Sequence, residues 1–205
     1  MLNSIPQIVI LVFSVVLHEV AHGRVALWKG DTTARDAGRL TLNPISHIDI
    51  FGTIIFPLLL LLTRSGILFG WAKPVPVNPW RFSDPKKDMA LVGAAGPASN
   101  FLLAVVAGIL IRLSIGSLGV NNALIQALSF AVSINLVLAF FNLMPIPPLD
   151  GSRIIMAFLP QELAESYARI ERFGFIIIFA LFFLGVFHRV IFPIVYVFFN
   201  LIVGR

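Results

Sequence analysis

The chain has 205 residues, of which 58% are hydrophobic and 12% are charged, and its formal net charge is +5 at pH 7. A soluble domain carries about 25% charged residues and needs a polar surface, so the composition argues against a soluble enzyme, a disordered chain and a nucleic-acid-binding domain. The sequence contains no cysteine, which excludes disulfides, cysteine metal sites and thiol nucleophiles.

Six apolar segments follow one another along the chain. They cover residues 5–27, 48–71, 89–113, 123–141, 173–187 and 190–203. The third and fourth have the length of a membrane-spanning helix. The last two are short, and the His188-Arg189 pair between them predicts a tight helical hairpin over 173–203. We expect an all-α integral membrane protein that forms a single domain over 1–205, with five to six hydrophobic segments and a three-helix core within 5–155.

The basic residues predict the orientation of these segments in the membrane. They cluster after the first span, before the third and after the fourth, and include Arg24, Lys29, Arg35, Arg39, Lys73, Arg81, Lys86, Lys87, Arg153, Arg169 and Arg172. Because cytoplasmic loops carry the excess of Lys and Arg, we expect the N-terminus outside the cell membrane and Arg205 in the cytoplasm. Segment 48–71 has cytoplasmic charges on both sides, so a re-entrant path, broken near Pro57 or Arg64, fits better than a full crossing.

The first span contains the sequence His18-Glu19-Val20-Ala21-His22 near its cytoplasmic end. Positions i and i+4 lie one turn apart on one helix face, so both imidazoles can bind one metal ion. Glu19 lies beside them, where a carboxylate can take a proton from metal-bound water. The alternative is that these are polar residues that merely cap a span, but ionisable groups within a membrane helix are costly and usually functional.

A catalytic zinc ion usually has three protein ligands, so a third is needed beside the two histidines. Asp150 is the best candidate, because it ends the proline-rich sequence Asn142-Leu143-Met144-Pro145-Ile146-Pro147-Pro148-Leu149-Asp150. The prolines deny the fourth span a regular helical end, which allows the chain to fold a carboxylate back toward the other helices at the depth of the histidines. Asp49 is the alternative ligand, and a helix stop with a capping Asp150 is the alternative without a metal.

These sequences resemble the site-2 proteases, the intramembrane zinc metalloproteases of the M50 class. The resemblance rests on HEVAH at 18–22, on NLMPIPPLDG at 142–151 and on Gly96-Pro97-Ala98-Ser99-Asn100, which is similar to a Gly-Pro-x-x-Asn motif in the third span. It covers roughly residues 5–155. The stretches 38–44 (GRLTLNP) and 70–79 (GWAKPVPVNP) look like the short bacterial and archaeal form, without PDZ or CBS domains.

The resemblance implies one zinc ion per chain, with His18, His22 and Asp150 as ligands and Glu19 as the catalytic base. It also implies hydrolysis of peptide bonds in or near the transmembrane segments of membrane-protein substrates, close to the cytoplasmic face. We expect a water-filled channel from the cytoplasm, gated by the second segment or by the terminal hairpin. No nucleic-acid partner is expected, and the sequence leaves the oligomeric state open.

Two asparagines in the core spans are further candidates for the site. Asn100 is predicted to hydrogen-bond the substrate backbone or to stabilise the oxyanion, although an asparagine there can equally link helices. Asn142 is predicted to orient the Asp150 loop or to contact substrate. Asn135 lies seven residues before Asn142, on roughly the same face of the predicted helix, and is expected to link helices.

The loops near the cytoplasmic end carry a weak strand pattern. Polar and apolar residues alternate over 39–43, and Val75 and Val77 suggest an extended partner. An edge strand near the metal could hold an unwound substrate by β-augmentation, and an ordinary loop is the alternative. Two other functions are considered: a metal transporter, which would repeat ionisable sites along a pathway through several helices, and an inactive member that only binds membrane segments, against which the intact Glu19 argues.

Overall fold

The regular elements of the protein are helices. The computed structural model describes residues 4–62 and 70–204, and the part of the chain so described contains no strand. In chain order the helices are α1 (Ser4–Trp28), α2 (Thr33–Asp36), η1 (Pro44–His47), η2 (Ile50–Ile55), α3 (Phe56–Leu62), η3 (Pro79–Arg81), α4 (Pro85–Leu118), α5 (Ala123–Asn142), α6 (Asp150–Met156), α7 (Gln161–Ala168), η4 (Arg169–Phe173), α8 (Gly174–Phe183), η5 (Phe187–Ile191) and α9 (Phe192–Val203). The expected all-α class is confirmed, while residues 39–43 form a loop and not a strand.

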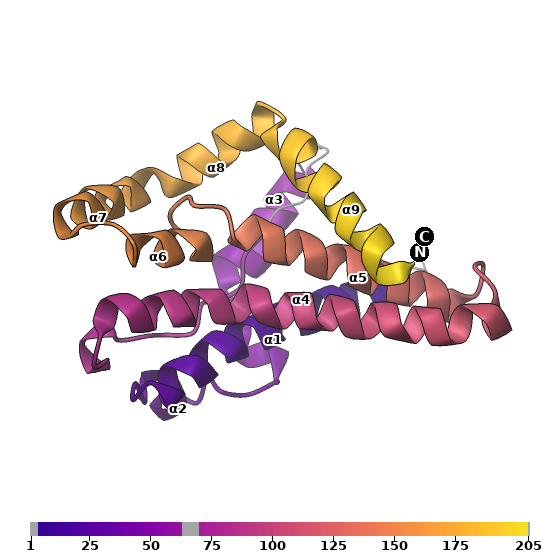
Figure 1. Cartoon of the computed structure of the whole chain (residues 1–205), viewed down its shortest axis with the longest axis horizontal. Coiled ribbons are helices and arrows are strands. Elements are labelled where there is room, and N and C mark those ends of the chain that lie inside the picture. Colours follow the sequence, from indigo (N-terminus) through magenta and orange to yellow (C-terminus); the bar gives the residue numbers. More distant parts are fainter. Residues whose placement is uncertain (1–3, 63–69, 205) are drawn as a thin grey trace.

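Three of these helices, α1, α4 and α5, are long and apolar enough to cross a membrane. They contain 25, 34 and 20 residues, and at 1.5 Å per residue each spans about the 30 Å hydrocarbon core of a bilayer. Helix α4 packs against both of the others (Figure 1). Small buried residues such as Ala104 and Ala107 allow helices to approach closely. The protein is therefore a multi-pass membrane protein with a three-helix core, as the sequence predicts.

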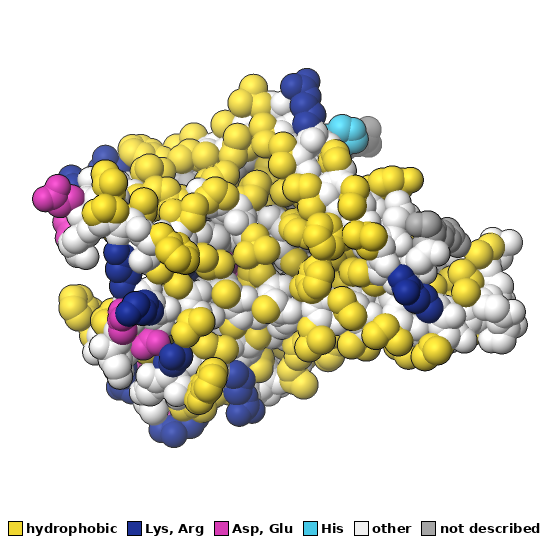
Figure 2. Space-filling view, viewed as in Figure 1, with side chains coloured by type: hydrophobic (Ala, Val, Ile, Leu, Met, Phe, Trp, Pro, Cys, Tyr) yellow, Lys and Arg dark blue, Asp and Glu magenta, His cyan; other side chains and the backbone are white. Residues whose placement is uncertain are grey.

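The charged side chains gather at one end of this helix bundle. Figure 2 shows Lys, Arg, Asp and Glu side chains concentrated at the end where α2, α7 and the start of α4 lie in Figure 1. At this end Lys29, just after α1, forms an ion pair with Asp88 in the first turn of α4, with N and O 3.0 Å apart. The pair fixes α1 and α4 as antiparallel neighbours, and we call this end of the molecule the charged end.

The second apolar segment leaves and returns at the same place. It begins with η2 and α3, and residues 63–69, which include Arg64, lie outside the described residues. The Trp71 N–H donates to the Gly52 carbonyl at 3.1 Å, and the Lys73 N–H donates to the His47 carbonyl at 2.9 Å. Because both ends of the segment are joined by hydrogen bonds, the path agrees with the predicted re-entrant segment.

The C-terminal helices form an open bend where the sequence predicts a closed hairpin. The chain turns after α8, at residues 184–186, and the directions of the two halves differ by 69°. The turn precedes His188, because Gly185 adopts a positive φ of 70° there. With this angle the two halves can cross a membrane as one broken span, which makes up to four crossings in the described chain.

The bend also determines where α9 ends. The Arg112 guanidinium, near the end of α4, donates a hydrogen bond to the Leu201 carbonyl, and Val203 belongs to the same buried cluster as Ile111. The start of α1 lies beside this half of α4 too, and both termini are marked at that end in Figure 1. The described ends of the chain therefore both lie along this half of α4, and the side of the membrane on which each terminus lies stays a prediction.

The absence of cysteine makes this arrangement directly testable. We expect a cysteine appended to the C-terminus and a Val120→Cys variant to react with a membrane-impermeant maleimide from the same side. A Trp80→Cys variant, whose side chain is 91% exposed at the charged end, should react from the opposite side. Labelling of the C-terminal cysteine together with Trp80→Cys would instead support the closed hairpin.

Candidate metal centre

The two histidines of the first span converge on one point. His18 and His22 lie one turn apart on α1, and their Nε2 atoms are 3.0 Å from each other. The rings meet edge to face, with an interplanar angle of 85°. Both residues are buried, with 7% of each exposed. The i, i+4 spacing thus brings both imidazoles together as the sequence predicts.

The opposite nitrogen of each ring has a hydrogen-bond partner that determines the tautomer. His22 Nδ1 lies 2.6 Å from the Val92 carbonyl oxygen, which can only accept, so Nδ1 carries the proton. His18 Nδ1 lies 2.6 Å from Asn100 Oδ1. In a neutral imidazole with Nδ1 protonated, Nε2 carries a lone pair and can only accept. Both Nε2 atoms therefore direct lone pairs to the point where the two rings converge.

Asp150 completes the group from the other side. The chain leaves α5, turns through a cis peptide bond between Pro147 and Pro148, and begins α6 at Asp150. Asp150 Oδ2 lies 3.1 Å from His18 Nε2 and 3.2 Å from His22 Nε2. It is buried and receives no hydrogen bond from a donor. The proline-rich loop therefore places the carboxylate where the sequence predicts it.

The geometry of these three atoms fits a tetrahedral metal ion. One proton can bridge only one of the three close pairs, whereas a divalent cation accepts all three lone pairs. Zinc bonds of about 2.0–2.1 Å in a tetrahedral site place the ligand atoms about 3.3 Å apart, close to the 3.0–3.2 Å found here. The three residues are the one group of this kind among the described residues. The donor set thus fits a zinc site with one open position.

A glycine in α4, Gly96, leaves room for the two imidazoles. A Cβ atom on Gly96 would lie 2.4 Å from His22 Nε2 and 2.5 Å from His18 Nε2, which is shorter than real carbon contacts. Pro97 follows, and its missing N–H leaves the Gly93 carbonyl without its helical donor. The Gly-Pro pair therefore serves the close approach of α4 to the histidines.

Asn100 lies in a buried network that holds His18 in place. Its amide nitrogen donates to the Ser14 carbonyl at 3.3 Å and to Asn135 Oδ1 at 2.8 Å, which turns its oxygen toward His18. Asn135 in turn donates to Ser14 Oγ at 2.8 Å. Asn100 is 0% exposed, and its oxygen faces His18, one of the three candidate ligands. The predicted substrate or oxyanion contact of Asn100 stays a prediction, and the predicted helix-linking role of Asn135 agrees with its bonds to Asn100 and Ser14.

The remaining candidates lie away from the three convergent atoms. Asn142 donates to the Leu138 carbonyl of its own helix at 2.9 Å, and no described hydrogen bond joins it to Asp150. Asp49 caps η2 by accepting from the Gly52 N–H at 2.7 Å, and it is not in the group that His18, His22 and Asp150 form. Glu19 is half-buried, and its Oε2 accepts from the Val75 N–H at 2.8 Å. The contact links Glu19, the predicted base, to the loop that contains Val75. The HEVAH motif alone does not predict this contact.

Comparison with known proteins places this centre in a family. The model of "Peptidase family M50" matches residues 119–185. A Bacillus subtilis protein described as "Putative zinc metalloprotease YwhC" is 42% identical over 188 residues, covering 88% of this chain and 82% of that protein. The chain belongs to peptidase family M50. A Mycolicibacterium smegmatis relative with the same description and the name Rip2 is 29% identical over 91% of this chain and 70% of its own length.

A more distant relative extends the comparison. "Zinc metalloprotease MJ0392" of Methanocaldococcus jannaschii is 28% identical over 155 residues, which cover 75% of this chain and 34% of that longer protein. No solved structure matches the chain significantly. The resemblance read from the three motifs is confirmed by the family, and with it the expected class of enzyme, a metalloendopeptidase.

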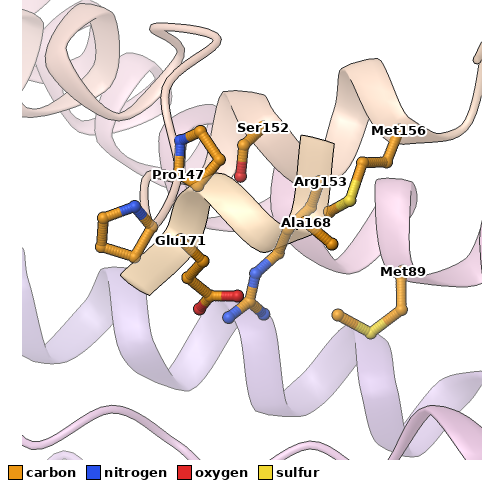
Figure 3. A pocket seen from close by; sticks show the side chains of 8 residues that line it. Met89, Pro147, Ser152, Arg153, Met156, Ala168 and Glu171 are labelled. Atoms are coloured by element: carbon orange, nitrogen blue, oxygen red, sulfur yellow. The ribbon is translucent and has the colours of Figure 1, made fainter. Parts of the chain in front are cut away.

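A small pocket lies along α6, the helix that begins at Asp150. Its volume is about 150 Å³, and its lining includes Ser152, Arg153 and Glu171. In Figure 3 the Arg153 guanidinium and the Glu171 carboxylate point toward one another, with Met89 on the other side of the guanidinium. Ser152 follows Asp150 by two residues, so this partly polar space lies next to the helix that supplies the carboxylate. It has room for several water molecules.

The close contact at Gly96 predicts a specific loss of metal. In Gly96→Ala the new methyl group displaces both imidazoles, and we expect the zinc affinity of the purified protein to fall by about tenfold or more. Gly116→Ala, in the same helix with no atom near its Cβ position, is the matched control and should keep its zinc. Equal zinc affinity of both variants, measured by chelator competition titration, would contradict the geometry.

The role of Asn100 predicts which substitutions the centre tolerates. Asn100→Leu removes the acceptor for the His18 Nδ1–H, and loss of such a partner weakens metal binding by about 10- to 100-fold. Asn100→Asp keeps an acceptor and should retain zinc better than Asn100→Leu in a chelator competition titration. The reverse order would show that Asn100 does not act through His18.

Proposed function

We propose that this M50 member is an intramembrane zinc metalloendopeptidase that cleaves membrane proteins in or near their transmembrane segments. The observation that carries the proposal is the convergence of two imidazole lone pairs and one unpaired carboxylate oxygen inside a bundle of membrane-spanning helices. The names of the relatives as zinc metalloproteases support zinc as the ion.

In this proposal His18, His22 and Asp150 hold one zinc ion through Nε2, Nε2 and Oδ2. The bound ion supplies Lewis acidity, which polarises a substrate carbonyl and lowers the pKa of water toward neutrality. Asn100 and the Val92 carbonyl keep both imidazoles in the tautomer that offers Nε2. Their fixed orientation means that the site needs little rearrangement when a substrate arrives.

Glu19 is proposed as the general base. It neighbours His18 on α1, and its carboxylate is held from one side by the Val75 N–H. From that position Glu19 takes a proton from the attacking water and delivers it to the nitrogen of the leaving amine. The peptide bond is thereby hydrolysed with one water consumed, and the carboxylate returns to its starting state.

The location of the centre favours substrates that span the membrane. His18 lies ten residues before the end of α1, which corresponds to about 15 Å along the helix. On the face drawn in Figure 2 the Lys and Arg side chains gather at the charged end, and by the positive-inside rule this end faces the cytoplasm. The pocket beside α6 is a proposed path for water from that side.

Two other functions fit the observations less well. A metal transporter needs successive ionisable sites along a pathway, and one such group is found among the described residues. An inactive binding protein has no need of a glutamate held beside the metal ligands. The single centre with its neighbouring Glu19 therefore favours catalysis.

The decisive test separates metal binding from chemistry. We expect Glu19→Gln to keep stoichiometric zinc. Its cleavage rate should fall by at least about 100-fold, the lower end of the contribution that a general base makes to the rate. Membrane-protein fragments are compared by mass spectrometry between cells with wild-type protein and cells with Glu19→Gln. Fragments that appear equally with both proteins, or a purified wild type without zinc, would contradict the proposal.

A further inference from the structure

A backbone amide of the loop between α3 and α4 contacts the proposed base directly. The Val75 N–H donates to Glu19 Oε2 at 2.8 Å, across 56 residues of sequence. Val75 is buried, with 7% exposed, while Glu19 is half-buried. A hydrogen bond to a carboxylate is charge-assisted and stronger than one between neutral groups. Glu19 thus has a defined partner that belongs to neither the metal ligands nor its own helix.

The sequence around Val75 isolates this donor. Pro74 and Pro76 flank it and have no N–H, so the Val75 amide is the single backbone donor of the three residues. Each proline fixes its own φ, and the residue before a proline is confined to extended conformations. The backbone around the amide therefore has few alternative shapes, and little conformational entropy is lost when it meets Glu19.

Two contacts hold this loop against the protein. Buried Arg39 donates from Nη2 to the Lys73 carbonyl at 2.7 Å and also approaches the Pro74 carbonyl at 3.4 Å. The Val75 side chain packs on α1 at Gly23, where a Cβ atom would lie 2.9 Å from Val75 Cγ1. Gly23 is one turn beyond Glu19, so the loop is seated on the helix that carries the base.

We propose that Pro74, Val75 and Pro76, anchored by Arg39, form a positioning element for the Glu19 carboxylate. The Val75 amide holds Oε2, which leaves Oε1 to accept the proton from water. Val75 and Arg39 touch neither substrate nor metal ligand in this role and act through Glu19. The inference rests on the proposed function of Glu19 as base and adds the residues that orient it.

Removal of the single amide tests this element. Replacement of Val75 by its α-hydroxy acid, through nonsense suppression in the full-length protein, keeps the side chain and removes the N–H. We expect kcat to fall by about 10- to 100-fold, the contribution of a hydrogen bond to a charged group. KM and zinc content should remain at the wild-type values, because neither substrate binding nor the metal ligands change. Cleavage is followed with a quenched-fluorescent peptide that carries one hydrophobic span.

The same ester at Val77 is the matched control, since Val77 also adjoins Pro76 and its amide is not the one at Glu19. A second pair of variants tests the anchor: Arg39→Met should lower kcat at constant KM, and Arg39→Lys should restore part of it. Equal kcat for the Val75 and Val77 esters would overturn the positioning role. If Glu19→Gln itself stays active, the proposed base fails; if Glu19→Gln is inactive and the Val75 ester is fully active, only the present inference fails.

Discussion

The burial of three convergent polar atoms that offer lone pairs is the constraint on which this structure depends. His18, His22 and Asp150 meet inside apolar helices, where an unpaired polar atom is costly. Each imidazole satisfies its N–H with a protein acceptor, and the three lone pairs remain for a cation. A divalent ion removes the repulsion among them, so we expect metal binding and the packing of α1, α4 and α6 to stabilise each other.

The helices around the centre are arranged to meet this constraint. Gly96 lets α4 approach the imidazoles, and α4 also supplies Val92 and Asn100 as their partners. Asn100 is then satisfied by Ser14 and Asn135 from α1 and α5. One polar network thus joins all three long helices at the depth of the two histidines, which explains why polar residues occur in otherwise apolar spans.

The sequence predicts the convergence of His18, His22 and Asp150 better than their surroundings. Helix geometry alone places two histidines at positions i and i+4 on one face. The prolines before Asp150 predict an irregular turn. Neither pattern reveals that the Asn100 oxygen faces His18, since a residue's depth in a span does not determine the direction of its amide. Helix α9, after the C-terminal bend, likewise packs on both α4 and α5, and the residues at the bend itself do not predict this packing.

The position of Glu19 shows why a backbone donor suits a membrane site. A lysine or arginine that held the carboxylate would bring a second long side chain and a charge into an apolar region, with the cost of desolvating it. A peptide N–H carries no net charge and must find an acceptor when buried in any case. Between two prolines it is also prevented from joining a helix or a strand. The Pro-Val-Pro sequence therefore directs one obligatory hydrogen bond to Glu19 and leaves the carboxylate as the sole net charge at that contact.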